Sequence, residues 1–209
     1  MIKKMALAAA LLGIIIYSIN GTRPDAGAYA AQINKARGEK NRSFRQGSSS
    51  PLSTEQKGQF DSLKYYPPQL DHKVAATISR NANPDTVLMQ MSDNRAEKYL
   101  HWGKANFEIN STPQQLGIYL KATGRDSTLF IPFTDLTNGH ETYGGGRYLD
   151  ATLPKRNEST IGLDFNRAYN PYCAYNPYCA YNNEYSCPVP PTENRLTVAI
   201  AAGEKSFHD

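Results

Sequence analysis

The sequence predicts a mainly β protein: a small antiparallel barrel or sandwich preceded by a short N-terminal helix. Many short segments alternate apolar and polar residues, which is the pattern of strands with one buried face. Short polar or glycine-containing turns separate nearly all of them. The chain has 209 residues, of which 40% are hydrophobic, and this is material for one domain with a modest core. Short strands joined by regular turns are typical of sandwiches and small barrels.

Residues 1–30 have the features of an export signal. Lys3 and Lys4 precede an uncharged apolar run from Met5 to Ile19, which is shorter than the roughly twenty residues that span a bilayer. The A-x-A-like cleavage motif, Ala28-Tyr29-Ala30, lies well beyond that run. We therefore expect either a signal peptide or an N-terminal membrane anchor, and an extracytoplasmic protein located in the periplasm, in the envelope or outside the cell.

Residues 31–50 are expected to form a basic helix and a linker. The helical part, Ala31 to Arg45, carries five basic side chains and one acidic one, and Ile33, Ala36 and Phe44 are its apolar positions. A GSSSP run then ends the pattern. The basic residues form either a solvated face or a surface that binds anionic lipids. The excess positive charge lies near the N-terminus, and the rest of the chain is slightly acidic. Nucleic-acid-binding proteins typically have a basic patch on the folded domain, so we predict no nucleic-acid partner.

Residues 51–209 are expected to form the β-rich domain. The clearest alternation, in His72 to Ser79, places Val74, Ala76 and Ile78 on one side of a strand. A turn sequence, NANPD, follows it. The other predicted strands are Thr86 to Met91, Glu97 to Trp102, Lys104 to Ile109, Gln115 to Ala122, Thr128 to Phe133, Arg147 to Thr152, Thr160 to Asn166 and Arg195 to Ala201.

A tandem repeat lies between Asp164 and Pro191, in a stretch that holds all three cysteines. The six residues AYNPYC occur at Ala168 to Cys173 and again at Ala174 to Cys179. Because Asn before Pro favours turns, the stretch is predicted to be a duplicated loop. Its tyrosines are expected either to stack on sugars or other flat ligands, or to cap the open end of the barrel as part of the core.

Three longer motifs resemble the domain of unknown function 1684 family. They are LFIPFTDLTNGHETYGGGRYLD at Leu129 to Asp150, LDFNRAYNPYC from Leu163, and YSCPVPPTENRLTVAIAAGEKSF from Tyr185. The family pattern is LFxPFxDxTxGxETYxGGRYLD, DFNxAYNPYC, CPxPPxEN and AGEK, and the chain matches it almost position by position. The resemblance covers roughly Ser50 to Phe207, except that the family has one AYNPYC unit where this chain has two. It implies no substrate or reaction, because the family itself has no assigned activity.

Polar residues crowd around the glycines of the first motif. We expect Arg147 to bind an anionic group through two parallel hydrogen bonds, with Asp135 or Glu141 as acid, base or metal ligand. The predicted pocket is built on the ETYGGGRYLD hairpin and the DFNRAYNPYC segment, and it binds a small polar or anionic ligand. The candidate ligand-binding residues are Asp135, Glu141, Tyr143, Arg147, Asp164 and Asn166.

Other readings of these polar residues stay open. A tight hairpin that needs positive φ explains the three consecutive glycines, and its charged residues would pair across strands. Alternatively, the protein is a cell-envelope hydrolase that uses the same carboxylates as acid and base.

The sequence identifies no cofactor and predicts no metal site. Its four histidines are scattered, and its three cysteines form no CxxC pair. Exported cysteines form disulfides by default, but three cannot all pair within one chain. The spacing in the resembling family implies that Cys179 pairs with Cys187, which leaves Cys173 able to join two molecules in a covalent dimer. The alternative pair is Cys173 and Cys187.

Overall fold

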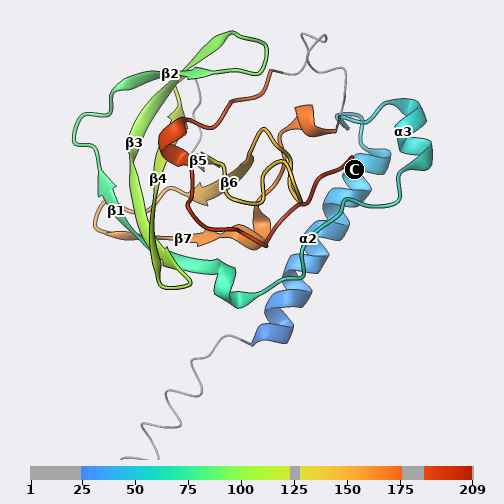
Figure 1. Cartoon of the computed structure of the whole chain (residues 1–209), viewed down its shortest axis with the longest axis horizontal. Helices are drawn as coiled ribbons and strands as arrows, with labels where there is room; N and C mark the ends of the chain where they lie inside the picture. Colours follow the sequence, from blue (N-terminus) through green and yellow to red (C-terminus); the bar gives the residue numbers. More distant parts are fainter. Residues whose placement is uncertain (1–24, 123–127, 176–185, 209) are drawn as a thin grey trace, which may run out of the picture.

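The computed structural model describes residues 25–122, 128–175 and 186–208. A seven-stranded antiparallel sheet curls into a nearly closed barrel, and one long helix lies along its side (Figure 1). The predicted mainly β architecture with a preceding N-terminal helix is therefore confirmed.

The elements follow one another in a simple order. The strands are β1 (Lys73–Arg80), β2 (Thr86–Gln90), β3 (Ala96–Ile109), β4 (Thr112–Lys121), β5 (Thr128–Phe133), β6 (Arg147–Thr152) and β7 (Thr160–Asp164). The α-helices are α2 (Ala26–Gln46) and α3 (Thr54–Gln59). Single 3-10 turns are η1 (Leu70–His72), η2 (Phe165–Arg167), η3 (Tyr172–Ala174) and η5 (Thr192–Asn194).

The strands pair in the order β6-β5-β4-β3-β1-β7, and β2 pairs with β3 beyond the end of β1. The core lies inside this curved sheet, where alternate residues of the strands meet, as the alternation predicted. Leu116 and Ile118 of β4 and Leu129 and Ile131 of β5 are fully buried there. The chain after β7 packs across the opening, and its last residues, dark red in Figure 1, end beside α2.

Strand β3 unites two segments that were predicted as separate strands. Its pairing with β4 shifts between His101 and Gly103, which marks a β-bulge. A Cβ atom at Gly103 would lie 2.4 Å from the carbonyl oxygen of Ser79 on β1, so only glycine permits this close approach. The glycine therefore bends the strand and does not end it.

The predicted strand from Arg195 to Ala201 is wrong. A single bridge, between Thr134 and Arg195, joins it to a neighbouring backbone, and further backbone groups of the segment bond to side chains. The N–H of Thr197 donates to Gln114 Oε1 (3.0 Å), and the N–H of Ile200 donates to Asp135 Oδ1 (3.1 Å). These side-chain bonds take the place of a continued ladder, so apolar alternation alone was insufficient to specify a strand.

Helix α2 begins at Ala26, earlier than predicted. Asp25 caps it by accepting hydrogen bonds from the N–H groups of Gly27 and Ala28, so the A-x-A-like motif lies inside the helix. The predicted signal peptide or anchor falls mostly on residues 1–24, which lie outside the described residues. Within the described ranges, no helix combines the length and the apolar character needed to cross a bilayer.

Gly146, the last of the three consecutive glycines, provides a test of the turn before β6. Its φ is +92°, and a Cβ there would lie 2.6 Å from Pro190 Cγ and 2.8 Å from the carbonyl oxygen of Phe133. We expect Gly146→Ala to lower the free energy of unfolding by about 1–3 kcal/mol. The matched control is Gly144→Ala, whose new Cβ would meet nothing closer than 3.7 Å. Equal losses for both variants in urea unfolding would contradict this explanation.

Candidate functional site

Arg147 is fully buried inside the barrel, where its guanidinium group donates four hydrogen bonds. Its Nη2 donates to Asp135 Oδ2 (2.8 Å) and to the carbonyl of Ile200 (2.9 Å). Its Nη1 donates to the carbonyls of Ala202 (2.5 Å) and Glu204 (3.2 Å). Both terminal nitrogens thus donate to groups of the protein. This geometry favours a structural role, in which Arg147 holds residues 186–208, the C-terminal segment, in place.

The other predicted residues of the hairpin lie nearer the surface. Glu141 is exposed and forms an ion pair with Lys205 (3.3 Å). The neighbouring Tyr66 hydroxyl and the Lys205 ammonium hold the pKa of Glu141 below its usual value. The carbonyl of Tyr143 accepts a hydrogen bond from Asn138 Nδ2 (2.6 Å). The structure therefore places Glu141 on the surface and the Asp135–Arg147 pair in the interior.

Asp164 and Asn166 lie at the end of β7 and contact α2. The hydroxyl of Tyr29 donates to Asp164 Oδ1 (2.7 Å) and accepts from Asn166 Nδ2 (2.9 Å). Burial and the neighbouring Asp164 carboxylate raise the pKa of Tyr29, so its phenol stays a neutral donor. These bonds fix α2 against the DFNRAYNPYC segment.

A cleft of about 150 Å³ lies between α2 and this segment; we call it the α2 cleft. Its apolar and aromatic wall comes from Ile33, Ala36, Tyr65, Ala168 and Tyr169. Its polar lining is Asn166 together with four charged residues, Arg37, Lys40, Arg167 and Glu204. The cleft thus combines an apolar wall with more positive than negative side chains.

Glu204 forms the buried acidic floor of the α2 cleft. Its side chain accepts hydrogen bonds from Lys40 Nζ (2.5 Å), the Tyr65 hydroxyl (3.3 Å) and the backbone N–H of Asn170 (2.9 Å), and also from the Tyr175 hydroxyl. Burial, and then the Glu204 carboxylate, raise the pKa values of Tyr65 and Tyr175 far above that of a free phenol. Both carboxylate oxygens of Glu204 therefore accept hydrogen bonds from protein donors, and the carboxylate charge neutralises Lys40.

Arg37 is the positively charged residue of the α2 cleft that forms no ion pair within the described part of the chain. Its Nη1 and Nη2 donate to the carbonyls of Tyr66 (2.8 Å) and Asn166 (3.1 Å), and its guanidinium lies 4.4 Å from the centre of the Tyr65 ring. Nε is buried and has no hydrogen-bond partner in the described part of the chain. Among the same residues, Arg167 pairs with Asp164 (3.4 Å) and Lys40 with Glu204, but no carboxylate pairs with Arg37. Burial lowers the pKa of Arg37, which reflects the cost of keeping this cation out of water.

Sequence reasoning missed Arg37, Lys40 and Glu204 as site residues. Glu204 stood out only as part of the AGEK motif, and the basic residues of α2 were interpreted as a solvated or lipid-binding face. The spacing of the two basic residues along the helix could have identified them. Arg37 and Lys40 follow the buried Ile33 at helical intervals and precede the buried Phe44, so all four lie on the face that packs against the barrel.

The cysteine predictions lie partly outside the described residues. Cys179 and the rest of 176–185 are not described, so the Cys179–Cys187 disulfide and the covalent dimer through Cys173 stay predictions. Cys187 Sγ accepts a hydrogen bond from the backbone N–H of Cys173 (3.3 Å), which brings these two residues together. Across 25–122, 128–175 and 186–208, no group of three or more His, Cys, Asp or Glu side chains is arranged to hold a metal ion.

Comparisons with known proteins identify the family and a similar solved structure. Curated proteins give no significant match. The solution NMR structure of an uncharacterized protein of Haloarcula marismortui is 36% identical, with a TM-score of 0.65, over 88% of this chain and 97% of that one. The profile of the family described as "Protein of unknown function (DUF1684)" matches residues 58–178 and 174–205. These two matches overlap within the second AYNPYC unit, as the duplication predicts. The chain therefore belongs to the DUF1684 family.

Proposed function

We propose that this protein binds a small anionic ligand in the α2 cleft, with Arg37 as the residue that recognises the charge. The DFNRAYNPYC segment, which was predicted to form part of the pocket, supplies Asn166 to Tyr169 of the wall. The ETYGGGRYLD hairpin contributes indirectly, because Arg147 holds the carbonyls of Ala202 and Glu204 beneath the cleft.

The charge of Arg37 is the observation that carries this proposal. A partly buried guanidinium without a carboxylate partner is costly, because no direct ion pair offsets its removal from water and the Glu204 and Asp164 carboxylates act on it only from a distance. A carboxylate or phosphate group would supply that charge and accept from Nε, and arginine binds both groups through its planar fork. A cleft of about 150 Å³ has room for such a group.

The binding function explains the carboxylates of the site better than the hydrolase alternative does. An acid–base pair must reach a common substrate. Asp135 instead bonds to Arg147 inside the barrel, and Glu141 bonds to Lys205 at the surface. Export to an extracytoplasmic compartment, through residues 1–30, stays part of the proposal as an expectation.

The test is the affinity of Arg37 variants for simple anions. We expect wild-type protein to bind acetate and phosphate in calorimetric titrations. Arg37→Met should weaken this binding at least about tenfold, the equivalent of about 1.4 kcal/mol, because the charge is lost. Arg37→Lys should retain part of the affinity.

Arg42→Met is the matched control, because Arg42 lies on the same helix but is exposed. It should bind both anions as the wild type does. Wild-type affinity in Arg37→Met, or no anion binding by folded wild-type protein, would contradict the proposal.

A further inference from the structure

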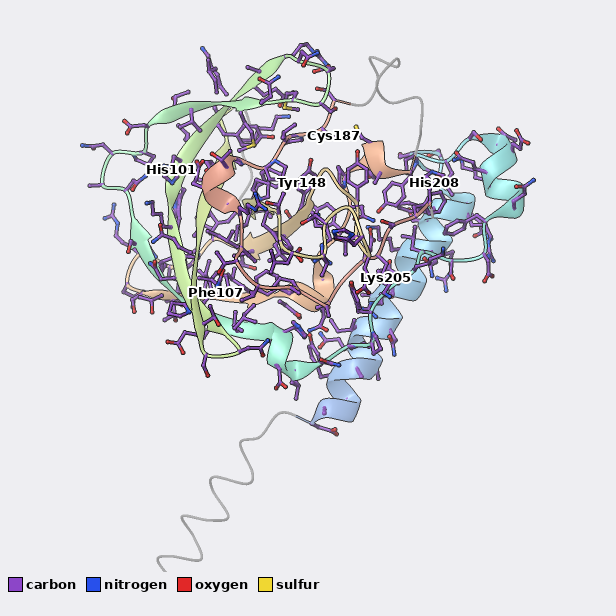
Figure 2. The ribbon with its side chains drawn as sticks, viewed as in Figure 1. His101, Phe107, Tyr148, Cys187, Lys205 and His208 are labelled. Atoms are coloured by element: carbon purple, nitrogen blue, oxygen red, sulfur yellow. The ribbon has the colours of Figure 1, made fainter. Side chains whose placement is uncertain are left out.

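A second and larger cavity adjoins the α2 cleft. Its volume is about 610 Å³, and it shares two lining residues, Lys40 and Tyr169, with the α2 cleft. We call it the aromatic cavity. Figure 2 labels two of its lining residues, Tyr148 on β6 and Cys187 on the C-terminal segment.

Four rings form a continuous wall of the aromatic cavity. Their centroids are separated by 5.8 Å for Tyr99 and Phe130, 4.9 Å for Phe130 and Tyr148, and 5.6 Å for Tyr148 and Tyr169. The hydroxyls of Tyr148 and Tyr169 donate to the Pro188 carbonyl and to Asp150. These two hydroxyl groups thus donate to protein partners, so their rings face a ligand mainly with carbon atoms.

Asn170 provides a buried polar group in the same lining. The residue is 2% exposed, and its Nδ2 donates to the carbonyl of Lys205 (2.8 Å). Its Oδ1 has no hydrogen-bond partner in the described part of the chain. A buried acceptor without a donor destabilises the protein, so a ligand that brings an N–H or O–H group would relieve this cost.

We infer that the ligands of this protein are aromatic acids that also carry a hydrogen-bond donor. The planar ring occupies the aromatic cavity, an N–H or O–H group faces Asn170 Oδ1, and the anionic group reaches Arg37 past Lys40. Aromatic rings pair favourably with ring edges and faces such as those of Tyr148 and Tyr169. This inference rests on the proposed anion site and adds the chemical class of the rest of the ligand.

A set of four probes separates these contributions: indole-3-acetate, 1-naphthaleneacetate, hexanoate and acetate. We expect indole-3-acetate to bind at least about thirtyfold more tightly than acetate, because the ring adds buried area and ring contacts. Its advantage over 1-naphthaleneacetate, which lacks the N–H group, should be about three- to tenfold. Hexanoate, which is apolar but not planar, should bind more weakly than either ring compound.

The variant Tyr172→Ala tests the location of the ring. Tyr172 lines the aromatic cavity and is 50% exposed, so its removal should leave the fold intact. We expect it to weaken indole-3-acetate binding about fivefold and to leave acetate binding unchanged. The control is Leu88→Ala on β2, another exposed apolar side chain, which lies outside this cavity.

The outcomes distinguish this inference from the function on which it rests. If acetate and hexanoate bind as tightly as indole-3-acetate, or if Tyr172→Ala changes nothing, the aromatic class is wrong while the anion site stands. Preferential binding of a sugar acid such as glucuronate would also overturn it. If none of the probes binds to folded protein, the anion site itself is wrong.

Discussion

Replacement of Arg147 by methionine is expected to lower the free energy of unfolding by about 3–5 kcal/mol, because it breaks a buried ion pair from one side. Asp135 would be left charged in the interior, and its carboxylate would keep only its bonds to neutral donors such as the N–H groups of Thr137 and Ile200. The carbonyls of Ile200, Ala202 and Glu204 would also lose the donor that they share.

Chemical unfolding of the purified variants measures this effect. Arg147→Lys keeps the charge but loses the planar fork, so it should still cost about 2 kcal/mol or more. Arg156→Met, at an exposed turn, is the control and should stay within about 0.5 kcal/mol of the wild type. A variant at Arg147 that fails to accumulate as folded protein agrees with the expectation. A methionine variant as stable as the control would show that Arg147 does not hold the C-terminal segment.

Glu204→Gln is expected to have the second largest effect on stability, a loss of about 2–4 kcal/mol. The amide would leave the Lys40 ammonium without its opposite charge. It would also present an NH₂ group to one of the present donors, the Tyr175 hydroxyl or the Asn170 N–H. Because these donors come from α2 and from the AYNPYC loop, the loss should loosen the contact between α2 and the barrel.

A double-mutant cycle with Lys40→Met tests this explanation of Glu204. The two substitutions should be non-additive by at least about 1 kcal/mol, since each removes the same partly buried ion pair. Glu193→Gln is the matched control: that exposed carboxylate accepts one hydrogen bond, from Tyr119 (3.0 Å), and its loss should cost less. Additive effects of the Lys40 and Glu204 substitutions would show that the ion pair does not stabilise the site.

The strands could be predicted because their determinants are local. Alternation of buried and exposed residues in β1, and from Leu149 onward in β6, follows directly from the two-residue period of a strand. The segment Arg195 to Ala201 has a similar pattern, but a single backbone bridge joins it to Thr134, and its other bonds include those to the side chains of Gln114 and Asp135, which are distant in the sequence. No local pattern reports such partners.

The candidate site could be predicted only in part for the same reason. The motif residues Asp164 and Asn166 pointed to the correct segment, but Arg37 bonds to the carbonyl of Asn166 across 129 positions of the chain. The sequence singled out Arg147, and the residue is fully buried. Its partners, however, are Asp135 and three carbonyls between Ile200 and Glu204, and not a ligand. Burial and partner choice depend on the tertiary fold, and a single sequence does not encode them in any short window.

The most direct test of anion binding in the α2 cleft is an NMR titration of ¹⁵N-labelled protein with sodium acetate. We expect saturable shifts of the Arg37 Nε–H signal and of the backbone amides from Asn166 to Tyr169, because the anion accepts from Nε and contacts that wall. Amides of the hairpin from Glu141 to Gly146 should stay unchanged. Saturable shifts confined to that hairpin, or no saturable shift at Arg37, would contradict the proposed site.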